Sequence, residues 1–132
     1  KGKLDDTGTR VPLIVSWPGT VKPGVVSNAL VDMSDFYATC VELARGELPA
    51  GLDSLSFVPA LSGQPVSRKW AYAEHGGKFW VRDQHYKMYD SGRFVVVSEE
   101  EPGVETVLKG PLNNEATAAQ RLLEQAVEHL TN

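Results

Sequence analysis

The chain has 132 residues, of which 42% are hydrophobic and 23% charged, a composition that suits a globular fold with a modest core. Its net charge of −4, without any run of lysine and arginine, excludes a typical nucleic-acid partner, because phosphate binding needs clustered basic side chains. No apolar stretch approaches the roughly 20 residues that span a bilayer, so we expect no membrane partner.

The first half of the chain predicts one strand and one helix. Residues 1–10 are polar and predict a loop, and residues 11–17 form an apolar, β-branched run that predicts a strand. Asp32 or Ser34 can cap a helix over residues 33–44, which Arg45 and Gly46 end. Residues 47–66 are irregular, with one helical turn at 57–61. The apolar stripe of this helix has helical spacing and comprises Met33, Phe36, Tyr37, Cys40, Val41 and Ala44.

Cys40 is the single cysteine of the chain, which excludes an internal disulfide and a cysteine-based metal cluster. Its place on the apolar stripe predicts a small residue buried in the core.

The second half predicts a small antiparallel sheet followed by a helix. Strand patterns cover residues 69–74, 77–82, 86–89 and 93–97, and the Asp90-Ser91-Gly92 turn indicates that the last two form a hairpin. Residues 114–130 carry an apolar stripe typical of a helix, with Asn113 or Asn114 as its cap. We expect the alternating aromatic residues of the strands to pack on this helix: Trp70, Tyr72, Phe79, Trp80 and Tyr89.

This order of elements predicts an α+β fold. The first strand and helix are expected to be the last β–α unit of an α/β domain, and the small antiparallel sheet packed by the C-terminal helix follows it. Because the first residue is lysine rather than methionine, we expect the chain to be a fragment or a processed product.

Six segments resemble one family, in the same order. The opening, with Lys1-Gly2, Arg10-Val11-Pro12 and then Trp17-Pro18-Gly19, is similar to the Lys-Gly-x-x-x-Glu-x-Gly-x-Arg-Val-Pro…Trp-Pro-Gly segment of the sulfatases, in the alkaline-phosphatase-like superfamily. Asp6 replaces the usual glutamate and Thr7 the first glycine of this segment. Five further segments extend the resemblance to about residue 108: 30–39, 48–56, 59–63, 81–89 and 101–105.

The resemblance implies the C-terminal fragment of a sulfuric ester hydrolase, inactive alone, that completes one side of the active site. Residues 1–66 would then be the C-terminal edge of the catalytic α/β domain with a connecting loop, and residues 67–132 the small sheet subdomain. It also implies that the Lys1 ammonium binds an oxygen of the sulfate ester substrate and stabilises the departing charge. Calcium and a formylglycine nucleophile are implied for the full-length enzyme, in a missing N-terminal catalytic region, and no cofactor is expected in this fragment.

Three other residues are candidates for the site. Arg10 can pair with Asp5 or Asp6 and so structure the first loop. His75 comes at a strand end before two glycines, in a region from which some sulfatases place a substrate-contacting histidine, so we expect it at the mouth of the pocket. The histidines make no i, i+4 pair, so we expect no metal site in the chain.

Two alternatives remain open. One is a phosphonate or phosphate monoester hydrolase of the same superfamily, and the other is a non-catalytic interaction domain. The exposure of residues 11–17 and of the helix at 33–44 distinguishes the interaction domain from a fragment of an enzyme. A severed domain would leave these apolar side chains uncovered and would form homo-oligomers through them, whereas an independent module would bury them. Since sulfatases are often exported, the resemblance implies a periplasmic or secreted location.

Overall fold

The structure, a computed structural model, describes residues 4–98, 100–101 and 103–131, with nothing stated for the side chain of residue 131. By packing, the chain divides into two units: Lys1–Val11 together with Lys69–Asn132, and Pro12–Arg68. The described residues from Leu4 to Val11 thus pack with the second half of the chain. We call these the sheet unit and the helical unit.

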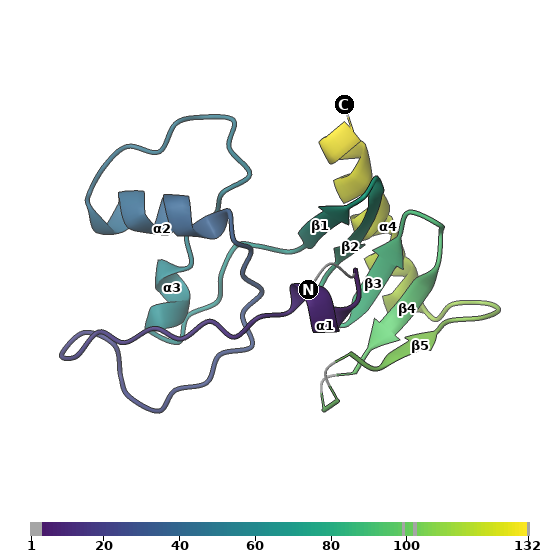
Figure 1. Ribbon diagram of the computed structural model, residues 1–132, viewed down its shortest axis with the longest axis horizontal. Coiled ribbons are helices and arrows are strands. Elements are labelled where there is room, and N and C mark those ends of the chain that lie inside the picture. The colour runs from purple at the N-terminus through teal and green to yellow at the C-terminus, as the bar shows by residue number, and fades with distance from the viewer. Residues whose placement is uncertain (1–3, 99, 102, 132) are drawn as a thin grey trace. The chain divides into compact units, whose positions relative to one another are not determined.

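The sheet unit is a five-stranded antiparallel meander with a helix on one face (Figure 1). Neighbours in the sheet follow chain order, and the predicted hairpin of residues 86–89 and 93–97 is confirmed. Between the first two strands lies a two-residue turn, Gly76-Gly77, whose φ angles of 61° and 72° favour glycine. The elements are β1 (Ala71–His75), β2 (Lys78–Arg82), β3 (Tyr86–Tyr89), β4 (Phe94–Val97), β5 (Glu105–Val107) and α4 (Asn114–Thr131).

The core of the sheet unit lies between α4 and one face of the sheet. Strand alternation brings Val81, Tyr86 and Phe94 to this face, where they meet the small and branched residues of the helix stripe. The cap prediction is confirmed, because the Ala116 N–H donates to Asn113 Oδ1 at 2.8 Å. The buried helix residues of this core are Ala116, Ala119, Leu123 and Ala126.

The aromatic prediction is correct in part. Trp70 and Tyr72 pack against the core, and Phe79 lies beside Tyr72 with ring centroids 5.5 Å apart. Trp80 and Tyr89 instead pair across β2 and β3 on the other face of the sheet, where a lysine lies against both rings. Alternation along β2 is the reason, since consecutive side chains cannot share a face.

Two short elements were not predicted. A four-residue helix, α1 (Asp6–Thr9), interrupts the expected polar loop, and β5 forms where we expected no strand. The α+β fold is confirmed by the antiparallel sheet and its helix. None of the helices in the described part of the chain has the length and hydropathy that a membrane crossing requires.

The helical unit contains α2 (Asp35–Leu43) and α3 (Val58–Leu61), close to the expected positions. Ser34 stands at the N-cap of α2, but its side chain makes no cap hydrogen bond; the backbone N–H of Ser34 donates to Asp32 instead. The chain leaves the helix through Arg45, which adopts φ 56°, and Gly46 follows it with an N–H bond to the Val41 carbonyl.

Two predictions for the helical unit are wrong. Residues 11–17 form neither helix nor strand, because no strand among the described residues supplies the ladder hydrogen bonds that a strand requires. Cys40 is exposed, because α2 turns Asp35, Ala38 and Thr39 inward rather than its apolar stripe.

Candidate functional site

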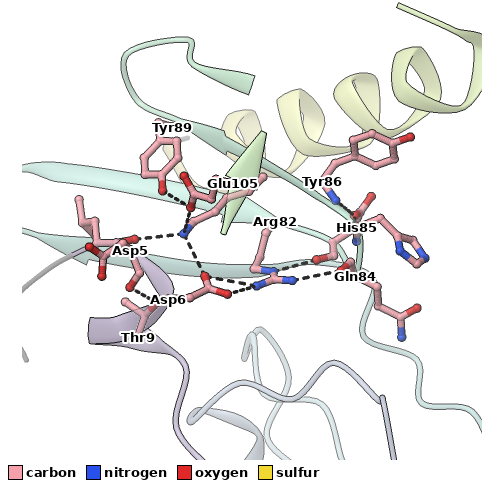
Figure 2. A network of polar contacts seen from close by, with 12 residues as sticks. Asp5, Asp6, Thr9, Arg82, Gln84, His85, Tyr86, Tyr89 and Glu105 are labelled. Atoms are coloured by element: carbon pink, nitrogen blue, oxygen red, sulfur yellow. Dashed lines mark hydrogen bonds and ion pairs between the residues drawn. The ribbon is translucent and has the colours of Figure 1, made fainter. Parts of the chain in front are cut away.

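A network of charged side chains occupies the face of the sheet opposite α4 (Figure 2). It begins at Asp6 in α1, whose side chain is only 2% exposed. The Asp6 carboxylate accepts hydrogen bonds from Arg82 Nη1 at 3.1 Å and from Lys87 Nζ at 3.2 Å. A helix of four residues is far too short to be stable alone, so these two contacts fix α1 on the sheet.

Lys87, in the central strand β3, is the most deeply buried member of this network. Its residue exposure is 0%, which is rare for lysine unless the ammonium is paired. Nζ donates to the Leu4 carbonyl at 3.2 Å, to Asp6 Oδ1 at 3.2 Å and to Glu105 Oε1 at 3.0 Å. An ammonium has three donors, so all of them have acceptors.

Glu105, in β5, is the second buried carboxylate of the network. Besides its contact with Lys87, Glu105 accepts a hydrogen bond from the Tyr89 hydroxyl. It also forms an ion pair with Arg93, whose Nη2 lies 2.9 Å from Glu105 Oε2. Burial, followed by the hydrogen bond to Glu105, raises the pKa of Tyr89 well above its ordinary value. The Tyr89 hydroxyl therefore stays a donor across the neutral range.

Arg82 joins α1 to the turn between β2 and β3. Its Nε donates to the Asp83 carbonyl at 2.9 Å and its Nη2 to the Gln84 carbonyl at 3.1 Å (Figure 2). Asp83 Oδ1 in turn accepts the backbone N–H groups of His85 and Tyr86. One guanidinium thus holds both the turn and, through Asp6, the N-terminal segment.

The members of this network satisfy one another, which decides what they can do chemically. Lys87 and Asp6 are buried and cannot touch a substrate, so the arrangement orders the polypeptide rather than performing a reaction. One polar atom stands apart: the indole N–H of Trp80 is buried and has no hydrogen-bond partner among the described residues.

The predicted site residues differ in their burial and in their contacts. Lys1 lies outside the described residues. Asp6 is at the centre of the network, whereas Arg10 is exposed and gives only its backbone N–H to the Asp6 carbonyl, at 2.9 Å. Asp6, one of the two carboxylates expected to pair with Arg10, meets Arg82 and Lys87 instead, because those cations lie on the sheet that α1 contacts.

His75 is exposed at the end of β1, opposite Lys78. Arg82 lies at the other end of β2, four residues from Lys78, which corresponds to about 13 Å along a strand. The structure therefore does not bring His75 to the charged network. Among the residues that the structure describes, no three histidine, cysteine or acidic side chains gather to hold a metal ion, so we derive no step through calcium in this chain.

A second buried ion pair orders the helical unit. Arg68 Nε donates to Asp35 Oδ2 at 2.6 Å, and the two side chains are 4% and 2% exposed. Asp35 also accepts the Leu55 N–H at 2.8 Å, while Arg68 reaches the Asp53 carbonyl at 2.6 Å. This pair fixes the start of α2 against the irregular segment at 53–57.

Sequence reasoning missed Arg82, Lys87 and Glu105. The strand pattern at 86–89 gave a weak signal, because within this strand Lys87 alternates onto the same face as Tyr89 and its charged partners lie on other elements. A lysine at such a position is usually solvated, and only its partners on α1 and β5 show otherwise.

Comparisons with known proteins identify the family. The family model described as "N-sulphoglucosamine sulphohydrolase, C-terminal" matches residues 1–97. An ulvan-active sulfatase of Formosa agariphila is 39% identical over 66 residues, which cover 50% of this chain and 13% of that protein. Human arylsulfatase G is 36% identical over 92 residues, covering 62% of this chain and 18% of its own length.

An N-acetylglucosamine-6-O-sulfatase of Bacteroides thetaiotaomicron is 32% identical, over 60% of this chain and 16% of the relative. No solved structure matches the chain. The three matches cover less than a fifth of the length of these curated relatives, so the chain corresponds to only a small part of each. Because the family model covers well over half of it, the chain belongs to the sulphohydrolase C-terminal domain family.

Proposed function

We propose that this member of the sulphohydrolase C-terminal family is part of a sulfuric ester hydrolase and completes one side of its active site. The observation that carries the proposal is the position of the family match, which begins at residue 1 and includes the segment that the buried network holds on the sheet. The lysine implied to contact sulfate stands three residues before Leu4 in that segment.

The chemistry proposed for Lys1 is electrostatic. An ammonium beside a sulfate oxygen makes a charge-assisted hydrogen bond and stabilises the negative charge that grows on the leaving group. Loss of one such donor costs about 10²–10³-fold in kcat in comparable sites. In this proposal calcium and the formylglycine nucleophile belong to residues outside this chain, so the chain alone is inactive.

The exposed apolar residues of the helical unit support a missing partner. Ile14 is 86% exposed, Val26 90% and Met33 72%. Large apolar side chains exposed to this extent are typical of a surface that a partner covers, and a module that functions alone would bury them. We therefore propose that the N-terminal catalytic region of the parent enzyme covers these residues, and that the isolated chain forms homo-oligomers through them instead.

The test compares turnover of an aryl sulfate, with calcium present, by this chain and by the product of its complete reading frame. Activity only in the longer product supports the proposal, and activity in the short chain contradicts it. In the longer product, Lys1→Ala should lose activity while Lys3→Ala, the matched control, should not. Preferential turnover of an aryl phosphate or phosphonate would favour the alternative hydrolase.

His75 stays a proposed substrate contact. It is exposed at the end of β1, where the Gly76-Gly77 turn begins, and this position would allow its side chain to lean over a pocket of the parent enzyme. His75→Ala should then raise KM for the sulfate ester, and the exposed His129→Ala serves as the control. Equal KM values for the two variants would remove His75 from the site.

A further inference from the structure

We propose that Lys87 is a positioning residue of the sulfatase site: its buried ammonium holds the segment from Leu4 to Asp6 on the sheet and thereby sets the place of Lys1. This inference rests on the proposed function, in which Lys1 contacts the sulfate. It adds a residue that does not itself meet the substrate, because Lys87 is fully buried and each of its three donors has an acceptor.

The first argument is where the three acceptors come from. Two of them, the Leu4 carbonyl and the Asp6 carboxylate, belong to the N-terminal segment, 83 and 81 residues away in sequence. The third, Glu105, belongs to the next-but-one strand of the sheet. One ammonium thus ties the N-terminal segment to the centre of the sheet, and it does so through a backbone carbonyl as well as a side chain.

The second argument is that the sequence of α1 does not hold the segment in place by itself. Helix α1 is a single turn whose sequence, Asp-Thr-Gly-Thr, contains no good helix former. Its one buried residue is Asp6, and the partners of that carboxylate are Lys87 and Arg82. These two cations therefore provide the buried contacts of the Asp6 carboxylate that hold the segment on the sheet.

The third argument is reach. Only Gly2 and Lys3 separate Leu4 from Lys1 in the sequence, and three residues of chain span at most about 10 Å. In a catalytic site a misplacement of about 1 Å can cost about 10²-fold in rate. We therefore propose that losing the anchor at Leu4 lowers the contribution of Lys1 to the reaction.

The geometry also explains why a charge is used at this place. Apolar packing has little directional preference, whereas each N–H of the ammonium points at one acceptor. The Lys87 ammonium also lies 4.9 Å from the ring centroids of both Trp80 and Tyr89, and these rings help to hold it in place.

The test is a double-mutant cycle in the product of the complete reading frame. Lys87→Met should lower kcat/KM for an aryl sulfate by about 10²-fold. Adding Lys1→Ala to it should cost little more, because a displaced Lys1 no longer contributes. The milder variant Asp6→Asn keeps the shape of the carboxylate and is expected to give the same result. It replaces Lys87→Met in the cycle if that variant does not fold.

Leu123→Ala is the matched control, because it destabilises the same unit from the other face of the sheet, in the core under α4. It should leave kcat/KM within about twofold below the unfolding temperature, and Lys1→Ala should keep its full effect in that background. Hydrogen exchange gives a second readout: amide protection of Gly8, Thr9 and Arg10 should fall in Lys87→Met and persist in Leu123→Ala.

The outcomes separate the two proposals. If Lys1→Ala alone has no effect, the proposed function fails, whatever Lys87→Met does. If Lys1→Ala costs activity but its effect adds in full to that of Lys87→Met and of Asp6→Asn, or if neither of these variants lowers activity, the positioning role is overturned and the function of Lys1 stands. Non-additivity confined to Lys87→Met and Asp6→Asn supports the role.

Discussion

The substitution Lys87→Met tests how much stability the buried network provides. Methionine fills a similar length of side chain but leaves two buried carboxylates, Asp6 and Glu105, without the ammonium they share. Removing one partner of a buried ion pair costs about 3–5 kcal/mol, because the remaining charge is desolvated and unpaired. This is a large share of the roughly 5–15 kcal/mol that stabilises a whole domain.

The expected shift in melting temperature follows from the size of the sheet unit. In a domain of this size each kcal/mol lowers the midpoint by about 4–8 °C, so the loss should be at least about 12 °C. Thermal and urea denaturation, followed by circular dichroism and by tryptophan fluorescence, measures it. The exposed Lys109→Met is the control and should change stability by less than about 0.5 kcal/mol.

A further variant separates charge from packing. Adding Asp6→Asn and Glu105→Gln to Lys87→Met removes the unpaired charges, so the triple variant should be more stable than the single one. The reasoning is refuted if Lys87→Met loses no more stability than Lys109→Met, or if neutralising both carboxylates gives no recovery.

Three further changes probe other contacts. Asp35→Asn leaves the Arg68 guanidinium buried without its counter-charge and should cost about 3–5 kcal/mol in urea denaturation; a loss below about 1 kcal/mol would contradict this. The folded structure raises the pKa of Tyr89, so this residue stabilises the fold below about pH 10, and its contribution is lost as pH rises through the higher folded-state pKa. Tyr89→Phe should therefore flatten the fall of the urea midpoint at alkaline pH. An unchanged slope of the midpoint against pH would refute this role of Tyr89. Asn113→Ala removes the cap of α4 and should cost about 1 kcal/mol, visible as an earlier loss of helical circular dichroism; an unchanged melting curve would show that the cap is dispensable.

Local patterns explain which elements could be predicted from the sequence. The β3–β4 hairpin and α4 have their turn, alternation or cap within a few residues, so their sequences predict them directly. β5 has only three residues and exists because β4 offers a free edge, a partner that its own sequence does not show. Helix α1 is equally invisible, since a distant sheet stabilises it.

The candidate site shows the same division. The resemblance drew attention to Asp6 because it replaces a glutamate, and the structure gives this carboxylate two cationic partners. Neither cation could be assigned from spacing, because the acceptors of Lys87 lie 81 and 83 residues before it and 18 residues after it. Periodicity places a residue on a face of a strand; it does not tell which faces another segment will cover.

The buried charges of the two units have the same role: each fixes the position of a segment that no apolar core holds. In the helical unit only two apolar residues, Ala38 and Phe57, are buried, against four polar ones, among them Asp35 and Arg68. Such a unit cannot owe its order to a core, and directed hydrogen bonds from Arg68 and Asp35 specify where residues 53–57 lie.

The same logic connects this polar interior to the apolar exterior. If the helical unit were ordered by its large apolar side chains, burying them internally would leave none for a partner. Because Asp35 and Arg68 set the internal arrangement, Ile14, Val26 and Met33 remain available at the surface for a partner. In the sheet unit Lys87 orders the segment from Leu4 to Asp6 in the same way, through directed hydrogen bonds from an interior position.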